Sequence, residues 1–426
     1  MSAAAVSGER LVPPARSRLQ QQKWRGGLCA VGLGLLLTVV QVLVSCLLSG
    51  RSNFHEAYLS LCQWDTVWYN SIVLAGYNAV PNALGEANVG FFPGYPYLTR
   101  QVRALTDLPS GDALLLTAQL SCWAFWSYLL LLLSSWGVPR RIALAVILSV
   151  LAYPAAFFLV GGYSESLFLA CTLGFLYWSE REGRLAAGLA AAHGFGMTAT
   201  RLVGLPLAVY PLARTLLGAT SGSGPSLRDR LQRCTVPLLI GLATAGGALT
   251  FFLFCQVRFG RWDLYLLTQH IGWGITPHYL AIFSRRVLRL RSAYSQTGGI
   301  DSDFISQLSV PVYLGAFVLL LGIEFWLRRR QGPSGFRRRA GLYLCAWLAF
   351  YISVSSMASR GMGSMIRHSL CVQVLLALAL GHLLTQAQRD AATARLGRLL
   401  PALCVPVFLA CELLLLYRFT HGGWVA

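Results

Sequence analysis

The sequence predicts an all-helical protein that crosses a membrane many times. Of its 426 residues, 55% are hydrophobic and only 12% are charged, and the mean hydropathy is +0.57. Soluble domains carry roughly 25% charged residues, so this chain has about half of the groups that usually keep a domain in water. Apolar segments alternate with short segments rich in arginine, which is typical of a polytopic membrane protein. The composition excludes a secreted disulfide scaffold, a disordered chain and an ordinary soluble enzyme.

The charge balance is strongly basic, with 35 lysines and arginines against 16 carboxylates. Because the basic residues fall mostly in short segments between apolar runs, they fit the positive-inside rule better than a nucleic-acid surface. We therefore expect no nucleic-acid partner. The eleven cysteines lie mostly inside apolar runs and lack the spacing of metal ligands, so neither a disulfide framework nor a metal site is predicted.

The first span is predicted at residues 26–50, after a basic segment at 1–25 that we expect to be cytoplasmic. This apolar run is too long for the core of a signal peptide. Residues 26–426 are then one transmembrane domain, and residues 51–110 form a first loop outside the cytoplasm. We expect interfacial helices in that loop, because it mixes aromatic and polar residues.

Ten further spans follow, which makes about eleven in all. They are predicted near 112–134, 142–161, 164–179, 185–213 (two short helices), 235–256, 309–328, 340–357, 368–386 and 399–417. The run at 185–213 is too long and is interrupted by Arg201 and Pro206, so we predict a helix pair that meets near Arg201. A second outer loop follows at 257–308.

Asp65 is the candidate catalytic residue of the first outer loop. The neighbouring Trp64, Trp68 and Tyr69 are aromatic side chains that favour the membrane interface. A carboxylate partly desolvated by such rings is suited to general-base chemistry. The alternatives are a helix cap or an interfacial anchor.

Two further motifs lie at outer positions. FFPGYP at 91–96 predicts a rigid aromatic turn, which either seats on the bilayer or forms a wall of a substrate pocket. YSES at 163–166 places Glu165 close to membrane depth, where an ionisable group is functional by default. Ser164 and Glu165 are equally suited to cap the following helix.

In this order, the three motifs resemble those of the PIG-V family of membrane mannosyltransferases. Weaker likenesses are the ATRLVG stretch around Arg201 and the later outer loop with Gln269 and Trp273. Leu202 and Val203 depart from the polar pair that the family pattern has after the arginine. The resemblance implies a GT-C glycosyltransferase fold and a donor in which mannose is carried on polyprenyl or dolichyl phosphate. It also implies an acceptor that is a glycan or glycolipid, and no cofactor.

The resemblance assigns the catalytic role to Asp65. An acceptor hydroxyl has a pKa far above neutrality, so a carboxylate must take its proton, while the lipid phosphate is already a good leaving group. Arg201, Arg285 and Arg367 are the cations predicted to hold that phosphate. The full set predicted to bind donor or acceptor is Trp64, Tyr69, Phe92, Pro93, Tyr95, Tyr163, Glu165, Arg201, Arg285, Gln269, Trp273 and Arg367.

Other interpretations remain open. Asp301-Ser302-Asp303 resembles the metal-binding pair of soluble glycosyltransferases, but its outer position favours a capping or loop role. A transporter or lipid flippase would also have many spans and an intramembrane arginine. A catalytically inactive relative is a third possibility. The expected location is a bacterial plasma membrane, or the endoplasmic reticulum membrane in a eukaryote.

Overall fold

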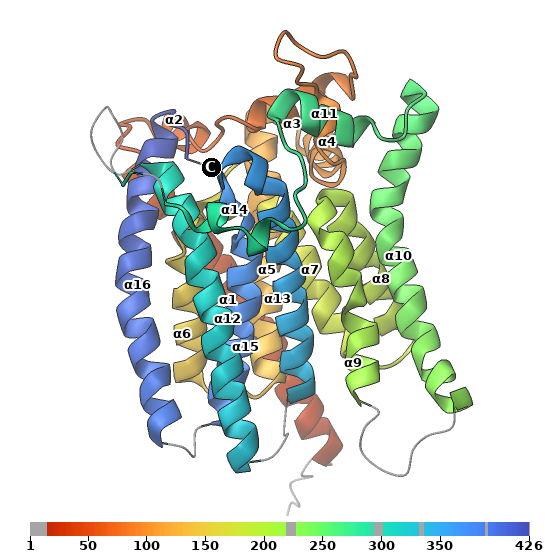
Figure 1. Ribbon diagram of the computed structural model, residues 1–426, viewed down its shortest axis with the longest axis vertical. Coiled ribbons are helices and arrows are strands. Elements are labelled where there is room, and N and C mark those ends of the chain that lie inside the picture. The colour runs from red at the N-terminus through yellow and green to blue at the C-terminus, as the bar shows by residue number, and fades with distance from the viewer. Residues whose placement is uncertain are drawn as a thin grey trace, which may run out of the picture.

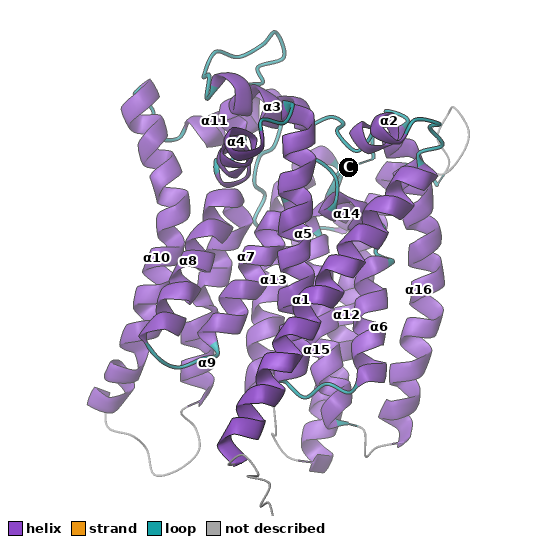
Figure 2. Cartoon of the chain, turned by 180° about the vertical axis from the view of Figure 1, so that it is seen from behind, coloured by secondary structure: helices purple, strands orange, loops and turns teal. Residues whose placement is uncertain are grey.

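The computed structural model describes residues 15–218, 227–290, 292–293, 301–331, 336–387 and 391–425. These residues form helices joined by turns and loops, and no strand occurs among them (Figure 2). The long helices run side by side in one bundle (Figure 1). The prediction of an all-helical polytopic membrane protein is therefore confirmed.

Seven helical stretches among the described residues are long and apolar enough to cross a membrane. They lie in α1 (Ala15–Leu48), α5 (Ser110–Ser135), α10 (Leu227–Phe259), α12 (Ser302–Gln331), α13 (Phe336–Met357), α15 (Leu370–Gln386) together with the preceding α14 (Met365–His368), and α16 (Ala391–Thr420). The predicted total of about eleven spans stays a prediction, because the other bundle helices are shorter.

The shorter bundle helices are α6 (Arg140–Leu151), α7 (Glu165–Ser179) and α8 (Arg184–Thr200). The predicted span at 142–161 is wrong in its extent, since α6 ends at Leu151 and a turn with a 3-10 helix, η2 (Ala156–Leu159), follows. Pro154 lies in that turn, and its missing N–H group cannot continue a helical hydrogen-bond ladder.

The predicted break at Arg201 is confirmed. Helix α8 ends at Thr200, and Arg201 is extended with φ −151° and ψ 136°. The chain continues as a 3-10 helix, η3 (Leu202–Val209), and then as α9 (Tyr210–Gly218). Pro206 lies inside η3 and removes one backbone donor there. Irregular backbone at membrane depth is tolerated where protein rather than lipid surrounds it.

Short helices from both predicted outer loops gather at one end of the bundle, the upper end in Figure 1. They are α2 (Phe54–Leu59), α3 (Thr66–Ala75), η1 (Asn88–Gly90), α4 (Gly94–Thr106), α11 (Leu264–Trp273), η4 (Ala281–Phe283) and η5 (Arg285–Leu288). The 3-10 helix η6 (Ala358–Arg360) directly follows α13 and contacts α11 through a hydrogen bond from Arg360 to Trp273. The side of the membrane that this end faces, and the domain boundaries, stay predictions that rest on the arginine-rich segments.

Two glycines let neighbouring helices of the bundle pack with their backbones close together. A Cβ on Gly34 of α1 would lie 2.7 Å from the Ser127 hydroxyl oxygen on α5, and a Cβ on Gly247 of α10 would overlap the Phe195 carbonyl oxygen on α8. Small residues at such crossings let backbones approach and gain van der Waals contact, which is the main packing force between helices in lipid.

A buried ion pair joins α12 to α13 far along the bundle from α3 and α11. The Arg339 guanidinium donates two hydrogen bonds of 2.7 Å to the two carboxylate oxygens of Glu324, and both side chains are only 3% exposed. Arg339 Nη1 also lies 3.1 Å from His382 Nδ1 on α15. Three helices therefore meet at one desolvated polar cluster.

The Asp-Ser-Asp motif caps a helix, as predicted. Asp301 Oδ1 accepts a hydrogen bond of 2.9 Å from the backbone N–H of Asp303 at the start of α12. The Ser302 hydroxyl donates to the Trp424 carbonyl oxygen at 3.2 Å. In the described part of the chain, no group of three or more His, Cys, Asp or Glu side chains could hold a metal ion.

Candidate active site

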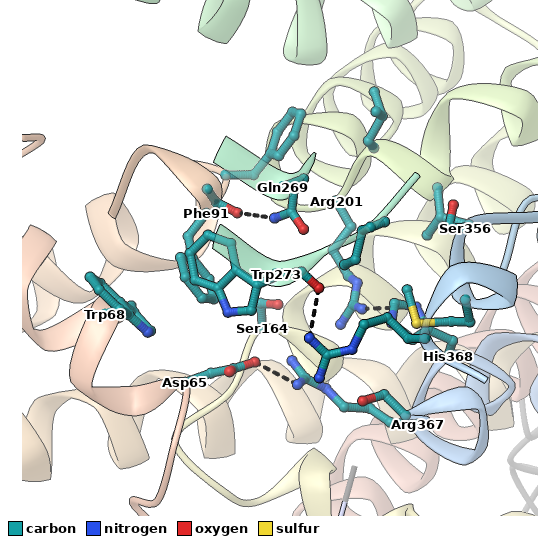
Figure 3. Close-up of a pocket in the computed structure, with 18 of the residues that line it drawn as sticks. Asp65, Trp68, Phe91, Ser164, Arg201, Gln269, Trp273, Ser356, Arg367 and His368 are labelled. Carbon is teal, nitrogen blue, oxygen red and sulfur yellow. Dashed lines mark hydrogen bonds and ion pairs between the residues drawn. The ribbon is translucent and has the colours of Figure 1, made fainter. Parts of the chain in front are cut away.

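Asp65 immediately precedes α3 and faces Arg367 rather than its own helix. Its side chain makes no hydrogen bond to the helix N-terminus, so the alternative that this carboxylate is a helix cap is wrong. Instead, Asp65 Oδ2 accepts a hydrogen bond of 2.6 Å from Arg367 Nη1 (Figure 3). The Asp65 side chain remains 19% exposed, so the carboxylate is both charge-paired and accessible.

Arg367 links two carboxylates that come from distant parts of the sequence. Its Nη1 donates to Asp65 and its Nε donates to Glu165 Oε1, which also accepts a hydrogen bond from Arg201. The Arg367 guanidinium lies 4.6 Å from the centroid of the Tyr163 ring, which adds a cation–π contact. Two arginines and two carboxylates thus form a network with no net charge.

Glu165 is the buried centre of this network. Among the described residues, its second oxygen, Oε2, is buried without a hydrogen-bond partner, while Oε1 accepts hydrogen bonds from both arginines. Ser164 occupies the N-cap position of α7, as the capping alternative predicts, but its hydroxyl makes no cap hydrogen bond and instead accepts a hydrogen bond of 2.9 Å from the Tyr69 hydroxyl. Burial raises the pKa of Tyr69, so this phenol is a neutral donor rather than a base.

A cavity of about 1220 Å³ opens in front of Asp65. This volume exceeds the roughly 300–1,000 Å³ that is usual for small-ligand sites. One wall is aromatic, with the ring centroids of Trp68, Phe91 and Trp273 between 5.4 and 6.2 Å apart. The opposite wall carries Arg201, Arg367 and His368, as Figure 3 shows. The cavity therefore combines an apolar wall, a cationic wall and the accessible carboxylate of Asp65.

The FFPGYP turn connects the aromatic wall to the helix break. The Phe92 ring lies 4.8 Å from the Tyr265 ring centroid and 5.0 Å from that of Phe251, so it joins the first outer loop to α10 and α11. A Cβ on Gly94 would lie 2.9 Å from the Ala199 carbonyl oxygen, so glycine lets α4 approach the end of α8 next to Arg201. The turn thus positions the cavity rather than merely seating on the bilayer.

The later outer loop supplies the other side of this wall. Gln269 Nε2 donates a hydrogen bond of 2.7 Å to the Gly90 carbonyl oxygen, and Arg360 Nη1 donates one of 2.6 Å to the Trp273 carbonyl oxygen. These two bonds tie α11 to η1 on one side and to η6 on the other. Described parts of the segments at 51–110, 257–308 and 358–368 are therefore held around one cavity.

The structure brings most of the predicted site residues together, but not all of them. Those that line the cavity are Trp64, Asp65, Tyr69, Phe92, Arg201, Gln269, Trp273 and Arg367. Those that do not line it are Pro93, Tyr95, Tyr163, Glu165 and Arg285. Tyr95 is fully buried and donates to the Leu114 carbonyl oxygen, Tyr163 donates to the Gln63 carbonyl oxygen, and Arg285 is exposed in η5.

Three residues that the sequence did not single out also line the cavity. His368 Nδ1 lies 3.5 Å from Arg201 Nη2, Arg360 borders Trp273, and Trp424 packs on Trp64. His368 directly follows Arg367, which is predicted from the sequence to hold the phosphate. No local pattern marks Trp424 as a neighbour of the first outer loop.

Comparison with known proteins gives partial sequence similarity. No family model matches the chain. The chain is 29% identical over 198 residues to GPI alpha-1,6-mannosyltransferase 2 of Mus musculus, which is 43% of this chain and 39% of the relative. It is 30% identical over 168 residues to the Cricetulus griseus protein of the same name, covering 36% of this chain and 32% of the relative. The chain thus spans well under half the length of these relatives.

Solved structures of low sequence identity cover nearly the whole chain. They include ArnT from Cupriavidus metallidurans bound to undecaprenyl phosphate, with a TM-score of 0.48 and 16% identity over 93% of this chain and 76% of that one. The archaeal oligosaccharyltransferase AglB from Archaeoglobus fulgidus has a TM-score of 0.46 and 12% identity over 91% of this chain and 55% of that one.

The class of protein is thus a helical membrane protein with a carboxylate–arginine cavity at one end of its bundle. The resemblance to the PIG-V mannosyltransferases that the motifs predict is confirmed by the sequence similarity over the aligned part of the chain.

Proposed function

We propose that this chain is a PIG-V-like membrane mannosyltransferase of the GT-C class. It transfers mannose from a polyprenyl- or dolichyl-phosphate-mannose donor to a hydroxyl of a lipid-linked or glycan acceptor, on the extracytoplasmic face. The observation that carries this proposal is the accessible Asp65 carboxylate at a cavity that also holds Arg201 and Arg367. The membrane is a bacterial plasma membrane, or that of the endoplasmic reticulum in a eukaryotic cell.

Asp65 is the general base of the proposed reaction. It removes the proton of the acceptor hydroxyl as the hydroxyl oxygen attacks the anomeric carbon, and the bond to the phosphate oxygen breaks with its electron pair. The products are a new glycosidic bond, a protonated Asp65 and the lipid phosphate. A direct attack inverts the anomeric configuration.

The arginines stabilise the charge that develops on the leaving phosphate. Arg367 and Arg201 already hold carboxylate oxygens, and the same planar donors suit phosphate oxygens. Because Arg367 contacts both Asp65 and Glu165, a phosphate that competes for its Nη1 group frees the Asp65 carboxylate. Glu165 keeps the Nε side of the guanidinium oriented.

The donor requirement tests the proposal. Purified protein in membranes, supplied with lipid-phosphate-mannose and a mixture of membrane glycolipids, should transfer mannose without GDP-mannose and in the presence of EDTA. The measurement is incorporation of labelled mannose into the glycolipid fraction. Strict dependence on GDP-mannose and manganese would overturn the proposal, because a lipid phosphate needs neither.

Arg201→Lys tests the donor-binding role. A lysine keeps the charge but loses the planar fork, so we expect the KM for lipid donor to rise about tenfold or more while the level of folded protein stays the same. The matched control is Arg103→Lys, an exposed arginine on α4. Unchanged kinetics with a lower level of folded protein would show instead that Arg201 serves only the ion pair with Glu165.

A further inference from the structure

The segment 422–425 lies against the first outer loop, next to Asp65. Trp64 and Trp424 pack edge to face with their ring centroids 5.1 Å apart, and Trp64 Nε1 donates a hydrogen bond of 3.2 Å to the Gly423 carbonyl oxygen. The Trp424 carbonyl oxygen in turn accepts from the Ser302 hydroxyl at the start of α12. The two tryptophans are therefore held in one arrangement by three separate parts of the chain.

Trp64 also carries backbone strain. Its φ of +52° lies in the left-handed region, which is unfavourable for a bulky residue and persists only where surrounding contacts impose it. The contacts of Trp64 with Gly423 and Trp424 are such contacts. This strained residue directly precedes Asp65, which in turn precedes α3. The segment 422–425 therefore helps to set the position of the Asp65 carboxylate.

Both indole side chains are more exposed to solvent than aromatic side chains in the protein core. Trp64 is 43% exposed and Trp424 is 39% exposed, and both line the cavity. The electron-rich face of an indole attracts the polarised C–H groups on the flat side of a pyranose ring. An exposed pair of indoles beside a catalytic carboxylate is suited to hold a sugar ring.

We propose that Trp64 and Trp424 form an aromatic platform that binds the pyranose ring of the acceptor and presents its hydroxyl to Asp65. This inference rests on the proposed transferase function. Asp65 is bonded through the backbone to Trp64, while its carboxylate contacts Arg367. Asp65, the aromatic pair Trp64 and Trp424, and the cationic pair Arg201 and Arg367 all line the same cavity. The cationic side suits the anionic donor, so the platform is assigned to the acceptor.

Steady-state kinetics distinguish an acceptor platform from a donor contact. Trp424→Ala should raise the KM for acceptor glycolipid about tenfold, which is the loss expected for one anchoring aromatic ring, and should leave the KM for lipid donor unchanged. Trp424→Phe keeps an aromatic face and should restore most of the affinity, which also guards against a variant that fails to fold. An unchanged acceptor KM, or an equal rise in the KM for donor, would overturn the assignment.

The matched control is Trp347→Ala on α13. Trp347 is 37% exposed, close to the value for Trp424, but it does not line the cavity. We expect the KM for acceptor and the KM for donor of the Trp347→Ala variant to equal those of the unsubstituted protein. If the KM for acceptor rose as much in Trp347→Ala as in Trp424→Ala, the loss of any exposed tryptophan would weaken acceptor binding. That result would overturn the platform.

A binding measurement separates failure of this inference from failure of the proposed function. The protein is labelled with 5-fluorotryptophan in lipid nanodiscs, and the signals of Trp64, Trp347 and Trp424 are assigned by substitution. Methyl α-D-mannopyranoside and methyl 2-amino-2-deoxy-α-D-glucopyranoside are the probes. We expect the fluorine signals of Trp64 and Trp424 to shift on titration while that of Trp347 stays.

Shifts at Trp64 and Trp424 without any mannose transfer would support the sugar platform and count against the transferase. Transfer in the donor assay with no shift at either tryptophan, for both probes at high millimolar concentration, would overturn the platform and leave the transferase intact.

Discussion

Asp65→Asn should reduce mannose transfer by about 10²–10⁴-fold, the usual contribution of a general base. The amide has nearly the same shape as the carboxylate, and its oxygen can still accept the hydrogen bond from Arg367 Nη1. The substitution therefore removes the proton acceptor while it leaves the packing in place. Turnover is measured with saturating lipid-phosphate-mannose and acceptor, and the level of folded protein is checked by gel filtration.

Two companion variants sharpen this test. Asp65→Glu should recover little activity, because one extra methylene moves the carboxylate by about an ångström and proximity effects are that steep. Glu56→Gln, at an exposed position of α2 in the same loop, should have a mild effect on turnover. If Asp65→Asn folds normally and keeps near-native turnover, Asp65 is not the base. Glu86, another carboxylate that lines the cavity, would then be the next candidate, because Glu165 is buried behind the arginines.

Arg339→Ala should destabilise the protein by about 3–5 kcal/mol, the usual effect of leaving a buried charge without its partner. The substitution leaves the Glu324 carboxylate without the guanidinium that neutralises it. This carboxylate accepts both hydrogen bonds of the Arg339 guanidinium and is almost completely buried. The expected result is a much shorter lifetime of the folded protein at a fixed elevated temperature. It is measured by tryptophan fluorescence in detergent micelles.

The control for this prediction is an exposed ion pair. Arg261 and Asp263 lie 2.8 Å apart with half of the arginine side chain in solvent, so Arg261→Ala should leave the lifetime of the folded protein nearly unchanged. The double replacement Arg339→Met with Glu324→Leu should regain most of the lost stability, since it removes both buried charges. Equal lifetimes for Arg339→Ala and Arg261→Ala would show that the buried pair does not hold α12 to α13.

The sequence was sufficient for the class of fold and for several local features. Apolar runs with a low charge content predict membrane helices, because the bilayer excludes unpaired polar groups. The break at Arg201 was predictable because an arginine and Pro206 interrupt one long apolar run. Asp65 was predictable as a site residue because its aromatic neighbours lie in the same short segment.

Predictions from residue type are incomplete where a local role competes with a tertiary one. Ser164 has a side chain suited to a helix cap, but its hydroxyl bonds to Tyr69, 95 positions earlier. Arg285 has the charge to hold a phosphate, and that role stays a prediction, but the residue is exposed in η5 and does not line the cavity. In both cases residue type was read correctly, while the neighbour in space could not be known.

The composition and the periodicity of the chain alone determined that this protein is a helical membrane protein with its aromatic, acidic loop near the first span. Only the tertiary structure decided what surrounds Asp65. Arg367 is 302 positions away in sequence and the Trp64–Gly423 hydrogen bond spans 359. Hydropathy is a property of a short segment and records which residues enter the membrane. The site depends on which helix ends meet. Their meeting follows from close packing between segments far apart in the chain, such as the approach of Gly94 to the end of α8.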